Sequence, residues 1–238
     1  MKKKSAILGF ILVVSASKIF AQTYQSHFPK LVFKYDWRGK SLDLIGRWSL
    51  DGVTLAQLKE QYDLLSPELV RSCEHDLPLF FEELFSVFNR GIKAKERTVL
   101  ISLTNRWSYG SHRFLVLGLR NILDPSPWCR KGSRSDEFTT TMFHELLHVW
   151  VDENVSQESP LVKKYSKEDI VVNAHIHLMA LQKMVYLNLN RPDLLEMIDD
   201  GYRNYAPLSY KRAWEIVNDI EGYEAVLKDI THCKNLEA

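Results

Sequence analysis

One stretch of the sequence combines the residue types that hold a metal ion and activate water. It runs from Thr139 to Trp150 and reads TTTMFHELLHVW, so that His144, Glu145 and His148 form an H-E-x-x-H pattern. Residues four apart on a helix leave the same face one turn apart, so both imidazoles can reach a single ion. Glu145 can act as the general base toward a water molecule held by that ion. The pattern predicts a hydrolytic metal site.

The motif resembles the active-site helix of the zincin superfamily of metallopeptidases. The resemblance implies one zinc ion per chain, bound by His144 and His148, with Glu145 as general base and a peptide or protein as substrate. The metzincin extension is absent, because Val151 and Asn154 occupy the positions of its glycine and third histidine. The Asn-Glu-x-x-x-Asp signature of thermolysin-like gluzincins is absent too. The resemblance therefore identifies the superfamily but does not identify a single family within it.

A catalytic zinc ion usually takes three protein ligands, so a third must come from elsewhere in the chain. His175 and His177 follow His148 by 27 and 29 residues, where gluzincin-like proteins place their third ligand. Two residues apart on a helix, their side chains point about 200° away from each other and cannot both bind one ion. His177 is the preferred ligand because its face is apolar and carries small residues, and His175 is the alternative. Weaker candidates are Glu168, Asp169, Asp152 and Cys129.

A hydrolytic site also needs a donor that stabilises the oxyanion, and Tyr, His or Arg can provide it. Candidates for this role, or for contacts that support the metal ligands, are Asn173, His112 and Tyr186. Four further tyrosines are equally possible as donors: Tyr109, Tyr202, Tyr205 and Tyr210. In zincins an edge strand before the motif helix aligns the peptide substrate, and residues 113–119 are its expected counterpart here. Their apolar alternation is equally that of a central strand.

The elements that must position these residues can be predicted from capping residues and periodicity. Ser135 or Asp136 is expected to cap the motif helix, which runs to about Glu153. Ser166 with Asp169 resembles a capping box and opens a helix to about Leu189. Three more helices are expected at 192–198, 209–220 and 223–230.

Before the motif, helices and strands alternate. A helix is expected at 54–65, and Pro67 indicates the start of another, which Pro78 breaks or kinks before it resumes to Phe88 and stops at Gly91. Strands are expected at 98–104 and 113–119. The predicted fold is α+β and zincin-like, with a small antiparallel or mixed sheet followed by a mostly helical C-terminal half.

Composition excludes several classes of protein. The chain has 238 residues, 45% of them hydrophobic, and 31 Lys+Arg stand against 30 Asp+Glu. This composition is not that of a disordered or low-complexity chain. A nucleic-acid partner is not expected, because phosphate binding requires a basic excess.

The N-terminal residues 1–21 have the order of a secretory signal peptide: three lysines, a short apolar run, then small residues. Residues 22–238 are then expected to form a single domain, secreted or periplasmic, with no stable membrane insertion after cleavage. In an oxidising compartment one disulfide could form among Cys73, Cys129 and Cys233.

The function predicted from the sequence is thus a secreted zinc-dependent metallohydrolase, and more specifically a peptidase. The alternative is a catalytically inactive zinc-binding protein of zincin fold with a binding or structural role in the cell envelope. A third interpretation is a metal-independent protein whose histidines pack in the core. Glu145 favours the enzyme, since a purely structural zinc site needs no adjacent base.

Overall fold

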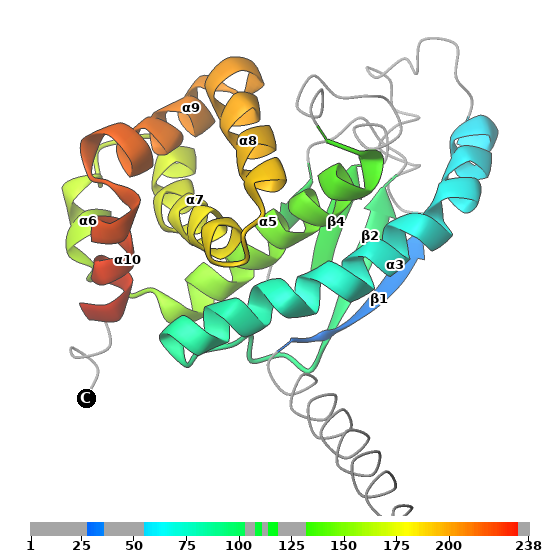
Figure 1. Ribbon diagram of the computed structural model, residues 1–238, viewed down its shortest axis with the longest axis horizontal. Coiled ribbons are helices and arrows are strands. Elements are labelled where there is room, and N and C mark those ends of the chain that lie inside the picture. The colour runs from blue at the N-terminus through cyan, green and yellow to red at the C-terminus, as the bar shows by residue number, and fades with distance from the viewer. Residues whose placement is uncertain (1–27, 36–54, 103–107, 111–113, 119–131, 233–238) are drawn as a thin grey trace, which may run out of the picture.

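The computed structural model describes residues 28–35, 55–102, 108–110, 114–118 and 132–232. Over these residues the predicted α+β class is confirmed, because a small mixed sheet is followed by a mostly helical region (Figure 1). Several predictions concern residues that lie outside these ranges or side chains that the structure does not describe: the signal peptide at 1–21, His112, Cys129, Cys233 and the side chain of Tyr109.

The sheet has four strands in the order β1-β2-β4-β3. Strands β1 (Lys30–Tyr35), β2 (Glu96–Ser102) and β4 (Phe114–Gly118) are parallel, and the short β3 (Tyr109–Gly110) pairs antiparallel with β4. The expectation that 113–119 forms an edge strand is therefore wrong, since β4 lies between β2 and β3. In the described part of the sheet, the edge strand next to β4 is β3.

Alternate side chains of the two central strands enter the core. Val99 and Ile101 of β2 and Leu115 and Leu117 of β4 are all buried. These four side chains give the sheet one apolar face, which needs a helical layer to cover it, and Val116 of β4 is buried on the other face. Two phenylalanines contact that layer, Phe33 of β1 and Phe28 just before it: Phe28 lies 5.3 Å from Phe81 and Phe33 lies 6.4 Å from Phe138, measured between ring centroids.

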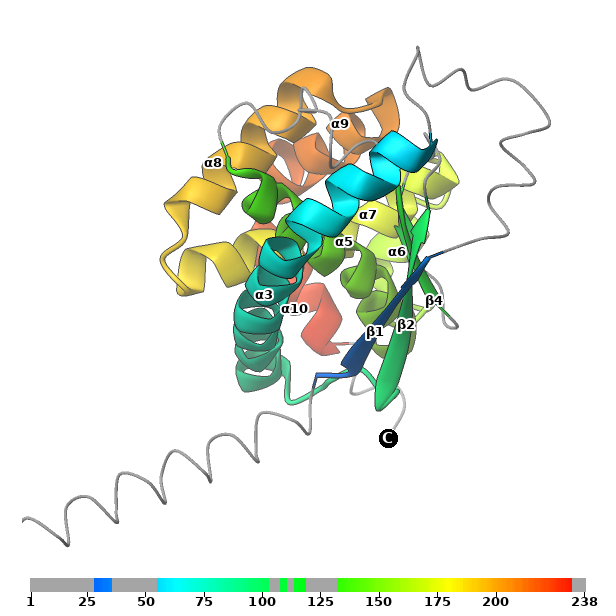
Figure 2. The same cartoon turned by 90° about the vertical axis from the view of Figure 1, so that its right-hand side faces the viewer.

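The first helix of this layer is α3 (Leu55–Phe88), one helix of 34 residues where the sequence predicted separate segments. Pro67 and Pro78 lie inside it, and Figure 2 shows that the helix changes direction along its length. Each interior proline costs a helix about 3 kcal/mol, whereas each buried Leu or Phe contributes about 1.5–3 kcal/mol. The helix therefore continues, because its buried stripe is unbroken: Leu69, Cys73, Leu77, Phe80, Phe81, Leu84 and Phe88.

α3 ends at Phe88, as predicted, but the residue that stops it is Asn89 and not Gly91. Asn89 has a positive φ of 52°, and its N–H donates to the carbonyl of Phe85 at 2.7 Å. Asparagine tolerates the left-handed conformation better than most residues, so it ends the helix without a glycine.

The motif helix is α5 (Arg134–Asn154), and it begins before the predicted caps Ser135 and Asp136. Ser133 is the cap instead: its hydroxyl accepts from the N–H of Asp136, and the carboxylate of Asp136 accepts from the N–H of Ser133. This reciprocal pair satisfies two backbone donors at the helix start. Figure 1 shows α5 between the sheet and α3 on one side and the C-terminal helices on the other.

The helix after the motif is α7 (Ile170–Asn188), which packs against α5, α9 and α10. Its cap is Asp169, whose carboxylate accepts from the N–H of Val171 at 2.7 Å, so Ser166 is not the cap. The remaining helical elements are α6 (Pro160–Lys164), α8 (Pro192–Asp200), the π-helical turn η2 (Gly201–Tyr205), α9 (Leu208–Glu215), the π-helical turn η3 (Ile216–Ile220) and α10 (Tyr223–His232).

By length and composition α7 is apolar enough to cross a membrane, with a mean hydropathy of 1.2. However, 67% of that stretch is buried inside the fold. Its apolar character is that of a core helix surrounded by other helices.

The one described cysteine, Cys73, is a buried free thiol on α3. Its sulfur lies 3.7 Å from the hydroxyl of Thr139 on α5. Burial raises the pKa of the thiol to about 12, so it stays protonated and packs as a small apolar group.

A pair of substitutions on α3 tests whether the buried stripe holds this helix in place. Leu77 is fully buried and Leu64 is 76% exposed, so Leu77→Ala should lower the free energy of unfolding by about 2–5 kcal/mol. Leu64→Ala makes the same change on the solvent side and should stay within about 0.5 kcal/mol. Urea unfolding followed by circular dichroism measures both, and equal effects would contradict the described packing.

Candidate metal site

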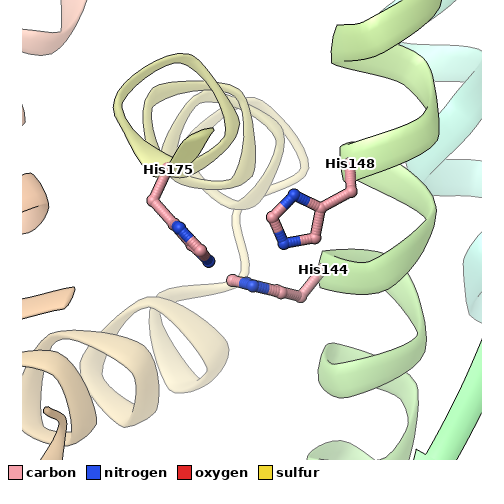
Figure 3. A group of neighbouring side chains, drawn as sticks. All are labelled: His144, His148 and His175. Carbon is pink, nitrogen blue, oxygen red and sulfur yellow. The ribbon is translucent and has the colours of Figure 1, made fainter. Parts of the chain in front are cut away.

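Three histidines from two helices point toward one another (Figure 3). His144 and His148 extend from α5, and His175 extends from α7. One ring nitrogen from each residue lies within 4.8 Å of the others. The ring centroids of His175 are 5.2 Å from those of His144 and 4.7 Å from those of His148. These three side chains could together hold a metal ion.

The preference for His177 as the third member of this group is wrong on the geometry. His177 extends from the opposite side of α7, where its Nε2 lies 2.8 Å from the carboxylate of Asp229 on α10. That carboxylate also accepts from the hydroxyl of Ser159 and from the N–H of Leu161. His177 thus fastens α7 to α10 and α6, and the alternative candidate His175 takes its place in the group.

In His144 and His175 one ring nitrogen makes a hydrogen bond and the other can bind an ion. His175 Nδ1 lies 2.6 Å from the carbonyl of Val171, which can only accept, so Nδ1 carries the proton and Nε2 holds a lone pair. His144 Nδ1 bonds the hydroxyl of Tyr202 at 3.0 Å. The Nε2 atoms of His144 and His175 are buried and have no hydrogen-bond partner among the described residues. Buried polar atoms in this condition are rare, and two such imidazole nitrogens side by side suit the ligands of an ion.

The surroundings keep all three imidazoles neutral. Burial lowers the pKa of His148 to about 3 and of His175 to about 4, and it lowers that of His144 well below its ordinary value. Repulsion among the three rings adds to the effect at His144 and His148. Neutral imidazole is the form that binds a metal ion, so all three side chains are in the metal-binding form at neutral pH.

Glu145 and Tyr210 lie close to the three histidines. Glu145 is only 4% exposed and follows the first histidine on α5. Tyr210 extends from α9 with its ring 4.1 Å from that of His175 and stacked 6.0 Å from that of His144. Burial raises the pKa of Tyr210, and the carboxylate of Glu145 raises it further. The tyrosine hydroxyl therefore stays a proton donor beside the site.

No protein-family model, curated protein or solved structure matches this chain. The site must therefore be interpreted from its own geometry and chemistry. Three neutral imidazoles, two of them buried and with orphaned Nε2 atoms, fit a metal ion better than they fit a packed core.

Other predicted site residues have structural roles. Asn173 donates its amide N–H to the carbonyl of Tyr165 at 2.8 Å and fastens the start of α7. Tyr186 lies in the core against Phe80 and Phe143, three hydrogen bonds away from His144. Tyr205 is exposed on η2.

The acidic alternatives for the third ligand also have other partners. Glu168 pairs with Arg212 of α9 at 2.9 Å, and Asp169 caps α7. Asp152 is exposed on α5, beyond the histidines. None of these three carboxylates belongs to the group of ligand atoms in the described part of the chain.

Sequence reasoning missed Gln182, whose side chain is fully buried and accepts from the hydroxyl of Tyr202 at 3.0 Å. A signal existed, because Gln182 lies seven residues, about two helical turns, after His175 and so shares its face. A buried glutamine on an apolar helix requires hydrogen-bond partners, and the only other polar groups nearby on that face are His175 and Tyr186.

Metal loading of histidine variants tests the assignment. His148→Ala and His175→Ala should each abolish stoichiometric metal binding, because each removes one of the three ligands. His177→Ala should retain the metal but lower the free energy of unfolding by about 1–3 kcal/mol, because it removes a partner of buried Asp229. Elemental mass spectrometry and urea unfolding measure the two effects. Metal loss in His177→Ala with retention in His175→Ala would refute the assignment.

The metal-free protein should lose stability as the pH falls below 6.5. Folding lowers the pKa of His148 to about 3 and of His175 to about 4, from 6.5 in the unfolded chain. Between pH 6.5 and about 4 the unfolded chain binds protons that the folded chain does not. Each histidine then lowers the free energy of unfolding by up to about 1.4 kcal/mol per pH unit, and above pH 6.5 this loss is absent.

Urea unfolding of the metal-free protein across that pH range measures the slope. The His175→Gln variant is the control, because it keeps a polar side chain that does not titrate, and its slope should be shallower. Equal slopes in the two proteins would show that His175 is not held neutral by the fold.

Proposed function

We propose that this chain is a zinc-dependent metallohydrolase of the zincin type that cleaves peptide bonds. The observation that carries the proposal is the convergence of His175 from α7 on the His144 and His148 pair of α5. Two histidines at helical spacing occur in many proteins for reasons of packing. A third imidazole brought beside them by a separate helix, next to a buried glutamate, is typical of a catalytic metal site.

The residues fit zinc in number and kind. Three neutral imidazoles are a common ligand set for catalytic zinc and leave a fourth position for water or substrate. The orphaned Nε2 atoms of His144 and His175 are the atoms that would bind. When bound, zinc acts as a Lewis acid and lowers the pKa of the water that it holds.

Glu145 would serve as the general base. Its carboxylate lies next to the ligand His144 and is shielded from bulk solvent, so a proton that it accepts from the attacking water can be passed to the leaving amine. Tyr210 would donate a hydrogen bond to the oxyanion, since its ring lies against His175 and its hydroxyl stays protonated.

A peptide substrate is supported by the position of the sheet. α5 contacts both β3 and β4, so the β3 side of the sheet lies near the helix that carries Glu145. An extended peptide can add to a sheet edge through main-chain hydrogen bonds, which would place a peptide bond near the histidines. The proposed enzyme consists of a signal peptide at 1–21 and one secreted or periplasmic domain at 22–238.

One observation favours the alternative, a zinc-binding protein without turnover. His144 and His175 are only 7% and 4% exposed, so in the described residues the site is accessible mainly from the side of the less buried His148. A closed site of this kind could serve a structural role. The two proposals differ in what they require of Glu145.

Glu145→Gln separates them. The variant keeps the three histidines and should bind one zinc ion per chain, but peptide hydrolysis should fall by about 10²–10⁴-fold because the general base is lost. Turnover of a mixed peptide library by the zinc-loaded protein, followed by mass spectrometry, is the measurement.

Glu158→Gln is the matched control, because it makes the same change at a side chain that is 70% exposed and pairs with Lys163. It should hydrolyse peptides as the unmodified protein does. Zinc binding without hydrolysis in all three proteins would favour the non-catalytic alternative.

A further inference from the structure

A chain of four buried hydrogen bonds begins at the metal-site histidine His144. His144 Nδ1 lies 3.0 Å from the hydroxyl of Tyr202, which donates to Oε1 of Gln182 at 3.0 Å. Gln182 Nε2 donates to the hydroxyl of Tyr186 at 3.3 Å, and Tyr186 donates to Oγ1 of Thr140 at 3.3 Å. We refer to Tyr202, Gln182, Tyr186 and Thr140 as the Tyr202 network.

The direction of these bonds determines where His144 carries its proton. A tyrosine hydroxyl has one proton, and that of Tyr202 is donated to Gln182. The bond between Tyr202 and His144 must then use the proton of the imidazole, so Nδ1 is the protonated nitrogen. A neutral imidazole has a single N–H, which leaves the lone pair on Nε2. This is the buried atom without a partner that faces the other two histidines.

The network is buried and joins three parts of the fold. His144, Tyr202 and Thr140 are 7%, 4% and 8% exposed, and Gln182 and Tyr186 are fully buried. Thr140 lies on α5 one turn before His144, Gln182 and Tyr186 lie on α7, and Tyr202 lies in η2. Both helices that carry metal-site histidines are therefore connected through the same hydrogen bonds.

The C-terminal segment holds the ring of Tyr202 in place. The ring packs 5.1 Å from that of Trp214 on α9, whose Nε1 donates to the carboxylate of Asp199 at 2.8 Å. Tyr202 is part of the π-helical turn η2, where the chain widens after α8. Such turns often occur where a helix must present one side chain to a functional site.

We propose that Tyr202 and Gln182 are positioning residues for His144. They hold the proton of the ring on Nδ1 and aim the lone pair of Nε2 at the ion. This inference rests on the proposed function, and it adds that an uncharged tyrosine and glutamine do what a carboxylate does beside many metal-binding histidines. Neither residue touches the substrate, so their effect passes through His144.

Tyr202→Phe tests this proposal because it removes the hydroxyl and keeps the ring that packs on Trp214. Tyr165→Phe is the control: Tyr165 is also a buried tyrosine, and its hydroxyl donates to Glu221 away from the network. Competition with a chelator should show that Tyr202→Phe weakens zinc binding about 10–100-fold, whereas Tyr165→Phe should bind as the unmodified protein does. Gln182→Met, similar in size but without an acceptor for Tyr202, should weaken binding as Tyr202→Phe does.

A second measurement does not depend on metal. Long-range ¹H–¹⁵N correlation spectra of the metal-free protein report which nitrogen of His144 is protonated. The unmodified protein should show the Nδ1–H form, and Tyr202→Phe should shift the population toward the Nε2–H form. A structural role of the hydroxyl alone would lower the melting temperature without changing this population.

The two measurements separate the failure of this inference from failure of the proposed function. An Nε2–H form in the unmodified protein, or unchanged zinc affinity in a folded Tyr202→Phe variant, would overturn the positioning role. If Nδ1–H is present, is lost in Tyr202→Phe, and yet no zinc binds, the hydrogen-bond assignment stands and the proposed metallohydrolase is wrong.

Discussion

The close approach of α5 and α7 is the constraint on which the rest of the structure depends. Ring nitrogens from both helices must come within 4.8 Å of one another, and no covalent bond holds them there. The sheet and α3 support α5 from one side, while α9 and α10 support α7 from the other. The buried polar contacts between the two helices, through Gln182, Tyr186 and Thr140, set their register next to the histidines. The fold thus brings the three imidazoles together between α5 and α7.

Burying an imidazole costs free energy unless its nitrogens find partners, and the two histidines of α7 differ in this respect. The Nε2 of His177 bonds the carboxylate of Asp229, which also accepts from Ser159 and Leu161. His175 bonds only the carbonyl of Val171, and its Nε2 faces the other two rings without a partner among the described residues. A satisfied histidine adds to stability, whereas an unsatisfied one reduces it unless a ligand compensates. That contrast is the physical reason to assign metal binding to His175.

Sequence alone predicted the parts of the site that depend on local geometry. The spacing of His144 and His148 fixes their common face on any helix, and the position of Glu145 follows from it. The choice between His175 and His177 could not be made in this way. Periodicity shows that the two diverge, but the face that meets α5 is decided by distant partners, such as Asp229, 52 residues after His177. The continuity of α3 across Pro67 and Pro78 was missed for a similar reason, since tertiary burial outweighed a local helix-breaking signal.

X-ray absorption spectroscopy at the zinc edge of the purified, zinc-loaded protein tests the central claim most directly. A site formed by His144, His148 and His175 predicts three imidazole nitrogens and one oxygen ligand at about 2.0–2.1 Å, with the multiple scattering that imidazole rings produce. His175→Ala, which should not bind zinc stoichiometrically, should not give this spectrum. A first shell with sulfur, or one with fewer than three imidazoles in the unmodified protein, would contradict the assignment of the three histidines as one metal site.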